Sequence, residues 1–308
     1  MNDIITHLLS KSCLLSEAVA LGLAVGVLTG LFGAGGGFII TPALNIFLGV
    51  KMDIAVATSS CQVLGASLFS LWYHLDRRFL GIKVAAFTAI GIPFGSYAGK
   101  GLVTRLSGAG SVELMGRTLP LVDFVLLCVF ALFLSLVAFW LILDNFWLRR
   151  HSADDDSSHV GLLGNLRIPP VFEFRTIHSG PFSVPILVLL GLMMGFLGGL
   201  LGIGGGGIMM PCLFYLVGQD TKHATCTSIM LIFLTGLFST VFYALDSKID
   251  YTLAAALLCG AFLGTRLGAA LQRRLSGKSI RKYFSLVVVA AVLMVSWKLW
   301  LMLFGSLP

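Results

Sequence analysis

The chain is organised around the stretch Gly30-Leu31-Phe32-Gly33-Ala34-Gly35-Gly36-Gly37-Phe38-Ile39-Ile40-Thr41-Pro42. A second copy reads Gly199-Leu200-Leu201-Gly202-Ile203-Gly204-Gly205-Gly206-Gly207-Ile208-Met209-Met210-Pro211, at an offset of 169 residues. Both copies lie inside uncharged apolar runs, where each glycine weakens a helix by roughly 1 kcal/mol relative to alanine. A broken backbone at membrane depth is tolerated only where it is packed in protein or lines a cavity. Paired interruptions in two halves of a chain therefore indicate a transporter's binding site.

Composition places the chain among polytopic membrane proteins. Hydrophobic residues make up 57% of the sequence and charged residues 11%, and the mean hydropathy is +0.96. Several uncharged runs exceed the roughly 20 apolar residues that a spanning helix needs; they cover residues 18–50, 54–75, 124–143, 179–219 and 223–245. The net charge of +7 is interpreted as loop Lys and Arg that set orientation, and not as a nucleic-acid surface. The six cysteines form no CxxC pair, which argues against a disulfide framework or a zinc site.

The offset of 169 residues holds without a gap over a long segment. Residues 21–101 match residues 190–270, and 26 of these 81 pairs are identical. An internal duplication of this length fixes the architecture. We expect a first transmembrane repeat over residues 1–148, a linker over 149–183 and a second transmembrane repeat over 184–308.

Each repeat predicts the same series of helices. The first run of each half is too long for one crossing and is interrupted by glycine, so we expect a broken hairpin of two short helices. Three transmembrane helices should follow, the second of which carries glycine at every fourth position, a spacing that allows close helix packing in lipid. The expected ranges are 16–50, 54–75, 82–102 and 121–147 in the first half and 184–219, 222–245, 251–271 and 283–304 in the second.

The distribution of Lys and Arg predicts that the two repeats are inverted. If each glycine-broken run turns back as a hairpin, the 21 basic residues divide 14 to 7 between the two faces, whereas a single crossing divides them 10 to 11. The positive-inside rule favours the unequal division. Both termini should then lie outside and the linker in the cytosol. The fold class expected is an all-α polytopic membrane protein of two inverted repeats.

The remaining motifs point away from soluble or catalytic chemistry. Gly202, Gly204 and Gly207 match the spacing of a dinucleotide fingerprint, but that motif needs a preceding strand and a βαβ unit. The sequence contains no GxxxxGK[ST] phosphate loop, no HExxH motif and no Ser-His-Asp set. We therefore expect neither an enzyme nor a cofactor, and no metal site. The linker charges nearly cancel, which is typical of a segment that rests on the membrane face.

The duplicated motif resembles that of the TauE/SafE sulfite exporter family of membrane permeases. It reads Gly-Leu-x-Gly-x-Gly-Gly-Gly with a later Pro, and about sixteen residues further on each copy has Ala-x-x-Thr-Ser, at residues 55–59 and 224–228. The resemblance covers nearly the whole chain except the first dozen residues and much of the linker. It implies transport of sulfite, sulfonates or related small oxyanions. One departure is Phe38, where the second copy has Gly207, so the two sites need not be equivalent.

An anion site also follows from the residues themselves. Short helices that begin at mid-membrane point their N-termini inward, and free N–H groups there favour negative charge. Hydroxyls at the start of the following helices add donors, although each could instead bond a carbonyl of its own helix. Gln62 is either a ligand or an interhelical hydrogen-bonding group, and its counterpart is Leu231. The expected binding residues are Gly35, Gly36, Gly37, Pro42, Thr58, Ser59 and Gln62 in the first half and Gly204, Gly205, Gly206, Pro211, Thr227 and Ser228 in the second.

Arg266 is a charged residue that follows fifteen uncharged ones and lies between Gly264 and Gly268. An ionisable residue inside the membrane is a functional hypothesis by default. Its place near the cytosolic end of its helix makes snorkelling to the interface an equal alternative.

These patterns favour a multi-pass transporter in the plasma (inner) membrane, whose partners are a small-molecule anion and the lipid bilayer, with no nucleic acid. The sequence leaves a homo-oligomer open. One alternative is a permease for another small solute or a metal ion, which should show Asp, Glu, His or Met clusters at depth. Met193, Met194, Met209 and Met210 surround the second glycine stretch but have no counterparts in the first half, so we interpret them as packing. The other alternative is a membrane sensor or assembly component.

Overall fold

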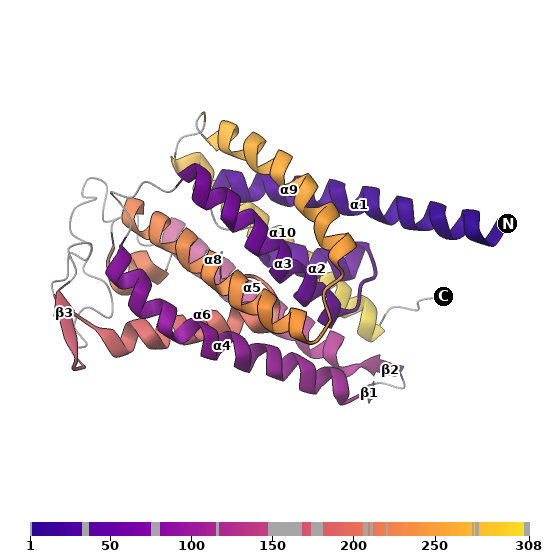
Figure 1. Cartoon of the computed structure of the whole chain (residues 1–308), viewed down its shortest axis with the longest axis horizontal. Helices are drawn as coiled ribbons and strands as arrows, with labels where there is room; N and C mark the ends of the chain where they lie inside the picture. Colours follow the sequence, from indigo (N-terminus) through magenta and orange to yellow (C-terminus); the bar gives the residue numbers. More distant parts are fainter. Residues whose placement is uncertain are drawn as a thin grey trace.

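The apolar runs form long helices that pack side by side in a computed structural model of the chain (Figure 1). The structure describes residues 2–32, 37–74, 81–114, 117–146, 168–173, 181–205, 209, 212–219, 221–272, 274 and 277–304. In the first half these form α1 (Asn2–Phe32), α2 (Gly37–Phe47), α3 (Met52–His74), α4 (Ile82–Gly108), β1 (Ser111–Leu114), β2 (Arg117–Pro120) and α5 (Leu121–Phe146). The strands β3 (Val171–Glu173) and β4 (Pro181–Ser183) precede the second half. The second half contains α6 (Val184–Leu201), the π-helix η2 (Cys212–Val217), α8 (Thr221–Leu245), α9 (Tyr251–Gln272) and α10 (Gly277–Phe304).

Seven of the helices in the described residues are long and apolar enough to cross a membrane, and they are α1, α3, α5, α6, α8, α9 and α10. The eighth long helix, α4, has 27 residues, which give it a length of about 40 Å. Its lysines and glycines lower its hydropathy, but it lies along α6 and α8 within the bundle. The expected all-α membrane fold is confirmed.

The hairpins differ in one respect from the expectation of two short helices. The first leg is long in both halves, with 31 residues in α1 and 18 in α6. Only the second leg is short, with 11 residues in α2 and six in η2. The helix α1 is long because it begins at Asn2, well before the apolar run that starts at residue 16. The helix α6 completes its 18 residues before Gly202 ends it in the left-handed conformation.

Helices of one half pack on helices of the other half through the matched glycines. The helix α1 lies along α9, and α4 lies along α6. A Cβ atom built at Gly26 would lie 2.6 Å from the Ala261 carbonyl oxygen, and one built at Gly264 would lie 2.8 Å from the Val27 nitrogen. Gly95 and Gly195 make the equivalent contacts, with Leu192 and Ile92. The glycines every four residues are therefore needed for close backbone approach.

Corresponding helices of the two halves run in opposite directions. The Asp250 N–H donates to Thr58 Oγ1 at 3.3 Å, so α3 begins where α8 ends and α9 begins. The Gly81 N–H donates to Thr227 Oγ1 at 3.2 Å, so α8 begins beside the start of α4. Hence α3 is antiparallel to α8, and α4 to α9. Because α1 is parallel to α9 and α4 is parallel to α6, α1 and α6 are antiparallel as well.

Both chain ends lie at one end of the bundle, and β3 lies at the opposite end (Figure 1). The structure adds two small antiparallel hairpins that the sequence had not predicted. One pairs β1 with β2, with Ser111 opposite Pro120, and the other pairs β3 with β4, with Val171 opposite Ser183.

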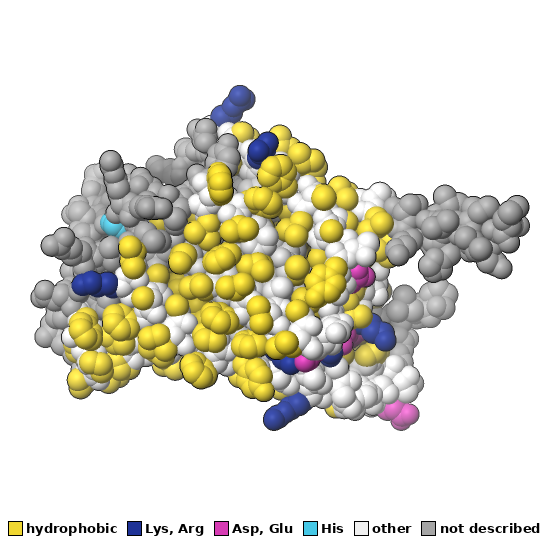
Figure 2. Space-filling model, viewed as in Figure 1, with side chains coloured by type: hydrophobic (Ala, Val, Ile, Leu, Met, Phe, Trp, Pro, Cys, Tyr) yellow, Lys and Arg dark blue, Asp and Glu magenta, His cyan; other side chains and the backbone are white. Residues whose placement is uncertain are grey.

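Apolar side chains cover the middle of the surface in Figure 2, and charged side chains lie at its margins. Exposed large hydrophobic residues include Trp72, Phe94, Leu132 and Leu245. A water-facing surface of this composition would be unusual, whereas the lipid-facing surface of a helical membrane protein is apolar. Two ion pairs, Lys100–Asp246 at 2.6 Å and Lys248–Asp53 at 3.2 Å, lie at the end of the bundle where α3 begins and α8 ends.

Candidate functional site

The two glycine-rich stretches meet in the centre of the bundle. Gly37, the first residue of α2, lies against the turn that follows α6, because a Cβ atom built there would be 2.8 Å from the Ile203 carbonyl oxygen. Val63 of α3 contacts both Gly37 and Gly204. Gly37, Phe38 and Ile203 are all buried. The broken backbones of both halves thus share one interior junction, which is bordered by α3.

The turn after α6 requires glycine at three positions. Gly202, Gly204 and Gly205 have φ angles of +70°, +63° and +74°, which only glycine adopts without strain. Gly202 ends α6 in the left-handed conformation, and its N–H donates to the Gly198 carbonyl. Its Cα faces Ser59, Val56 and Thr41 from the other half. The second glycine stretch is therefore a tight turn that presents backbone to α2 and α3.

Ser59 links the two stretches through hydrogen bonds. Its Oγ lies 2.6 Å from Thr41 Oγ1, 3.0 Å from the Val56 carbonyl oxygen and 3.3 Å from the Gly202 carbonyl oxygen. The side chains of Thr41 and Ser59 are fully buried. A hydroxyl has one proton and two lone pairs, so Ser59 donates to one carbonyl at a time and can exchange that bond for another. Thr41 was not among the predicted site residues, although it lies within the first glycine-rich stretch, one residue before Pro42.

Gln62 is one turn beyond Ser59 on α3, and its side chain is fully buried. Neither its Nε2 nor its Oε1 has a hydrogen-bond partner among the described residues. A buried amide without partners costs roughly 1–3 kcal/mol, and most buried polar atoms in proteins are paired. A group in this state is suited to bind a polar solute that enters the interior.

Thr58 and Thr227 occupy equivalent positions and make equivalent bonds. Each accepts a backbone N–H from the start of a helix in the other half, Asp250 for Thr58 and Gly81 for Thr227. Both side chains are buried. These bonds join the repeats to each other, and a further role of the two hydroxyls as ligands stays a prediction.

Of the other predicted residues, the structure describes Ser228 and Pro42 and does not describe the remaining four. Ser228 Oγ donates to the Thr225 carbonyl of its own helix at 2.8 Å, so the structure gives it a local bond and no link to the junction among the described residues. Pro42 is buried within α2. The predicted residues Gly35, Gly36, Gly206 and Pro211 lie outside the described residues.

Around the junction, the described side chains offer neutral donors and acceptors in apolar surroundings. Val56, Ile203, Leu200 and Leu201 belong to one buried hydrophobic cluster, and Phe38 packs edge-to-face on Phe284 with 5.9 Å between ring centroids. No group of three His, Cys, Asp or Glu side chains comes together in the part of the chain that the structure describes. The arrangement can hold a small polar solute by hydrogen bonds.

Comparison with known proteins gives a consistent result. The family model described as "Sulfite exporter TauE/SafE" matches residues 18–295. The "Probable membrane transporter protein YunE" of Bacillus subtilis is 26% identical over 278 residues, which cover 88% of this chain and 93% of the relative. A "Probable membrane transporter protein" of Xylella fastidiosa (strain 9a5c) is 24% identical over 282 residues, covering 91% and 94%.

A shorter similarity extends to plants. The "Sulfite exporter TauE/SafE family protein 3" of Arabidopsis thaliana is 32% identical over 120 residues, 35% of this chain and 23% of the relative. No solved structure is significantly similar to the chain. Because the family model covers most of the chain, with both glycine-rich stretches and at least part of every long helix, this multi-pass membrane protein belongs to the TauE/SafE sulfite exporter family of membrane transporters.

Proposed function

We propose that this transporter exports a small sulfur oxyanion, such as sulfite or an organosulfonate, through a site at the junction of the two glycine-rich stretches. The observation that carries the proposal is the fully buried Gln62 amide without a partner among the described residues, one turn from the Ser59 that bridges Thr41 and Gly202. The family description, which names sulfite export, supports the substrate class.

The surroundings of the junction favour an anion over a cation. The helix α2 begins in the interior at Gly37, so its free N–H groups and its positive dipole end point inward. The amide N–H₂ of Gln62 and the hydroxyls of Thr41 and Ser59 can donate to oxyanion oxygens. A small tetrahedral or pyramidal oxyanion accepts several such bonds without a positively charged partner. The other predicted residues of the two stretches, and Thr58, Thr227 and Ser228, would border this site.

We further propose that the halves form inverted repeats, with residues 1–148 and 184–308 as the two copies and 149–183 as a cytosolic linker. Support comes from the opposite directions of α3 and α8 and from the position of both termini at one end (Figure 1). Reporter fusions at Ser158 and at the C-terminus should report opposite sides of the membrane. If both report the same side, the inverted arrangement is wrong.

Export of an anion needs no coupling ion under the proposed orientation. Asp53 and Asp246 form ion pairs with lysines, and the sequence places its carboxylates at segment ends. A proton relay through intramembrane carboxylates is therefore not required. An anion that leaves a negatively charged cytosol gains about 2.3 kcal/mol per charge per 100 mV.

Proteoliposomes loaded with sulfite test both the substrate class and the driving force. An imposed membrane potential should change the rate of sulfite efflux, and a pH gradient alone should not, once sulfite speciation is corrected for. Efflux that follows the proton gradient and ignores the potential would contradict electrogenic export. No protein-dependent flux of sulfite, taurine or sulfoacetate would contradict the substrate class.

A further inference from the structure

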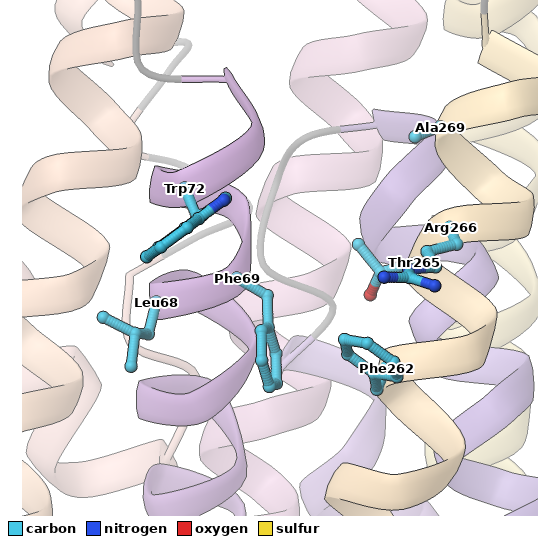
Figure 3. A pocket seen from close by; sticks show the side chains of 7 residues that line it. All are labelled: Leu68, Phe69, Trp72, Phe262, Thr265, Arg266 and Ala269. Carbon is cyan, nitrogen blue, oxygen red and sulfur yellow. The ribbon is translucent and has the colours of Figure 1, made fainter.

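A cleft opens between α3 and α9, away from the junction and toward the end of α1. Its volume is about 310 Å³, and it is lined chiefly by Leu68, Phe69 and Trp72 of α3 and by Phe262, Thr265 and Arg266 of α9 (Figure 3). Six residues separate Gln62 from Leu68 on α3, a rise of roughly 9 Å along the helix. The cleft is thus a separate feature from the proposed oxyanion site.

The cleft faces the bilayer. The side chain of Trp72 is 91% exposed and that of Leu68 is 54% exposed, and both belong to the apolar span that covers Met52–Trp72. Thr265 is buried beneath the opening, and its hydroxyl donates to the Ala261 carbonyl at 2.7 Å. An open groove with these apolar walls fits an acyl chain better than a hydrated ion.

One charge lies in this apolar groove. The guanidinium carbon of Arg266 lies 4.5 Å from the centre of the Phe262 ring, and Phe262 packs against Phe69 with 5.0 Å between ring centroids. Figure 3 shows the guanidinium above the Phe262 ring, at the gap that faces α3. Arg266 lies within the apolar span Tyr251–Leu271, and no ion pair joins it to a carboxylate of the described residues.

At the equivalent place in the other half, an aromatic side chain replaces the cation. By the 169-residue offset, Tyr97 stands at the position of Arg266. Its ring packs edge-to-face on Phe242 with 5.6 Å between centroids, and Phe242 stacks on Phe238. The cation is therefore a property of one half and is not required by the repeated packing.

We propose that the cleft binds one anionic phospholipid, whose phosphate pairs with Arg266 and whose acyl chain lies against Leu68, Phe69 and Trp72. A guanidinium pairs with phosphate through two parallel N–H···O bonds, and its position over Phe262 leaves its edge free to do so. The lipid would stand between α3 and α9, next to α1, where Gly30 packs on Thr265. Under the proposed orientation this lipid belongs to the cytosolic leaflet; the binding itself does not rest on that orientation.

Native mass spectrometry of the purified full chain tests the proposal. The protein is equilibrated with micelles that contain either phosphatidylglycerol or phosphatidylcholine, and the bound lipid is counted. We expect one phosphatidylglycerol to be retained in preference to phosphatidylcholine. Arg266→Ala should weaken its binding about fivefold to tenfold, and Arg266→Lys should recover part of this loss. The matched control is Arg274→Ala, which removes an exposed cation just beyond the same helix and should leave binding unchanged.

Fluorescence gives a second readout that needs no Arg266 variant. Phosphatidylglycerol with brominated acyl chains should quench the Trp72 component, measured as the difference between the wild type and Trp72→Phe, at lower concentration than brominated phosphatidylcholine does. Equal quenching by the two lipids would overturn the proposal. So would equal losses in Arg266→Ala and Arg274→Ala, which indicate general surface attraction. Displacement of the lipid by millimolar inorganic phosphate or sulfate would overturn it in favour of a free-anion site.

Discussion

The helices α3 and α8 are copies of one segment, yet their matched polar positions make different contacts. Ser59 on α3 contacts Thr41 and the Gly202 carbonyl, whereas Ser228 on α8 bonds within its own helix. Gln62 has no partner among the described residues, whereas its counterpart Leu231 is packed in a buried hydrophobic cluster.

The positions that remain equivalent in the two halves are those that join the halves. Thr58 and Thr227 accept reciprocal backbone bonds, and the matched glycines form both of the close helix pairs. The duplication thus preserves the scaffold, and the polar groups of the centre have diverged. This difference is why we propose a single asymmetric site made mostly from the first half.

The largest expected effect is at the glycine contacts, where the halves should be equally sensitive. Gly95→Leu between α4 and α6, and Gly264→Leu between α9 and α1, each force a side chain into backbone. Each should destabilise the fold by about 4 kcal/mol or more, so that the variant cannot be purified as a monodisperse protein. The control Gly101→Leu has open space around its Cβ position and should purify as the wild type does. A strong effect in only one of the two variants would show that the two glycine contacts are not equivalent.

The next largest effect is on sulfite efflux, and it compares a glycine in the turn at the junction with a glycine in a turn at the surface. Gly205 and Gly49 both have positive φ angles, +74° and +64°, so Gly205→Leu and Gly49→Leu carry similar backbone strain of roughly 1–2 kcal/mol. Gly205→Leu should abolish sulfite efflux while the protein still inserts into the membrane. Gly49→Leu, which has open space around it, should retain efflux. Equal efflux from both variants would remove the second stretch from the site.

A smaller effect compares the two serines. Ser59→Ala removes a buried link among Thr41, Val56 and Gly202, and should lower the free energy of unfolding by about 1–2 kcal/mol. Ser228→Ala removes one bond within α8 and should cost less than about 0.5 kcal/mol. Thermal unfolding in detergent should give a lower midpoint for Ser59→Ala than for Ser228→Ala. A lower midpoint for Ser228→Ala would mean that the serine of α8 has the larger structural role.

The smallest effect tests the reciprocal threonines. Thr58→Val and Thr227→Val each remove one acceptor for a backbone N–H, and both should lower the free energy of unfolding by about 1 kcal/mol. Because the two bonds are equivalent, the two shifts in the unfolding midpoint should agree. A difference of twofold or more would show that the ends of the bundle are not equivalent.

Helix positions were predictable from the sequence because charge-free runs and glycine breaks mark them directly. The predicted ranges 54–75 and 251–271 differ by at most two residues at either end from α3 and α9. The length of α1 was not predicted, because the helix begins at Asn2, before the apolar run that marked its expected start at residue 16. The hairpins β1–β2 and β3–β4 were missed because they lie in polar segments without a strand pattern long enough to recognise.

The candidate site was only partly predictable. Composition identified Ser59 and Gln62 as polar residues in an apolar helix, but not which of them lacks a partner. The contact between Ser59 and Gly202 joins positions 143 residues apart, and no local pattern encodes such a distance. Thr41 could have been included, since its hydroxyl lies inside the repeated stretch where the second copy has Met210.

Replacing Gln62 with leucine, the residue of its counterpart Leu231, tests the oxyanion site most directly. Gln62→Leu removes a buried amide without a partner, so the free energy of unfolding should rise by about 1–3 kcal/mol. If the amide binds the transported oxyanion, the rate of sulfite efflux from proteoliposomes should fall by about tenfold or more. We therefore expect Gln62→Leu to be more stable than the wild type and to lose transport. Wild-type efflux in Gln62→Leu would contradict an oxyanion site at this junction.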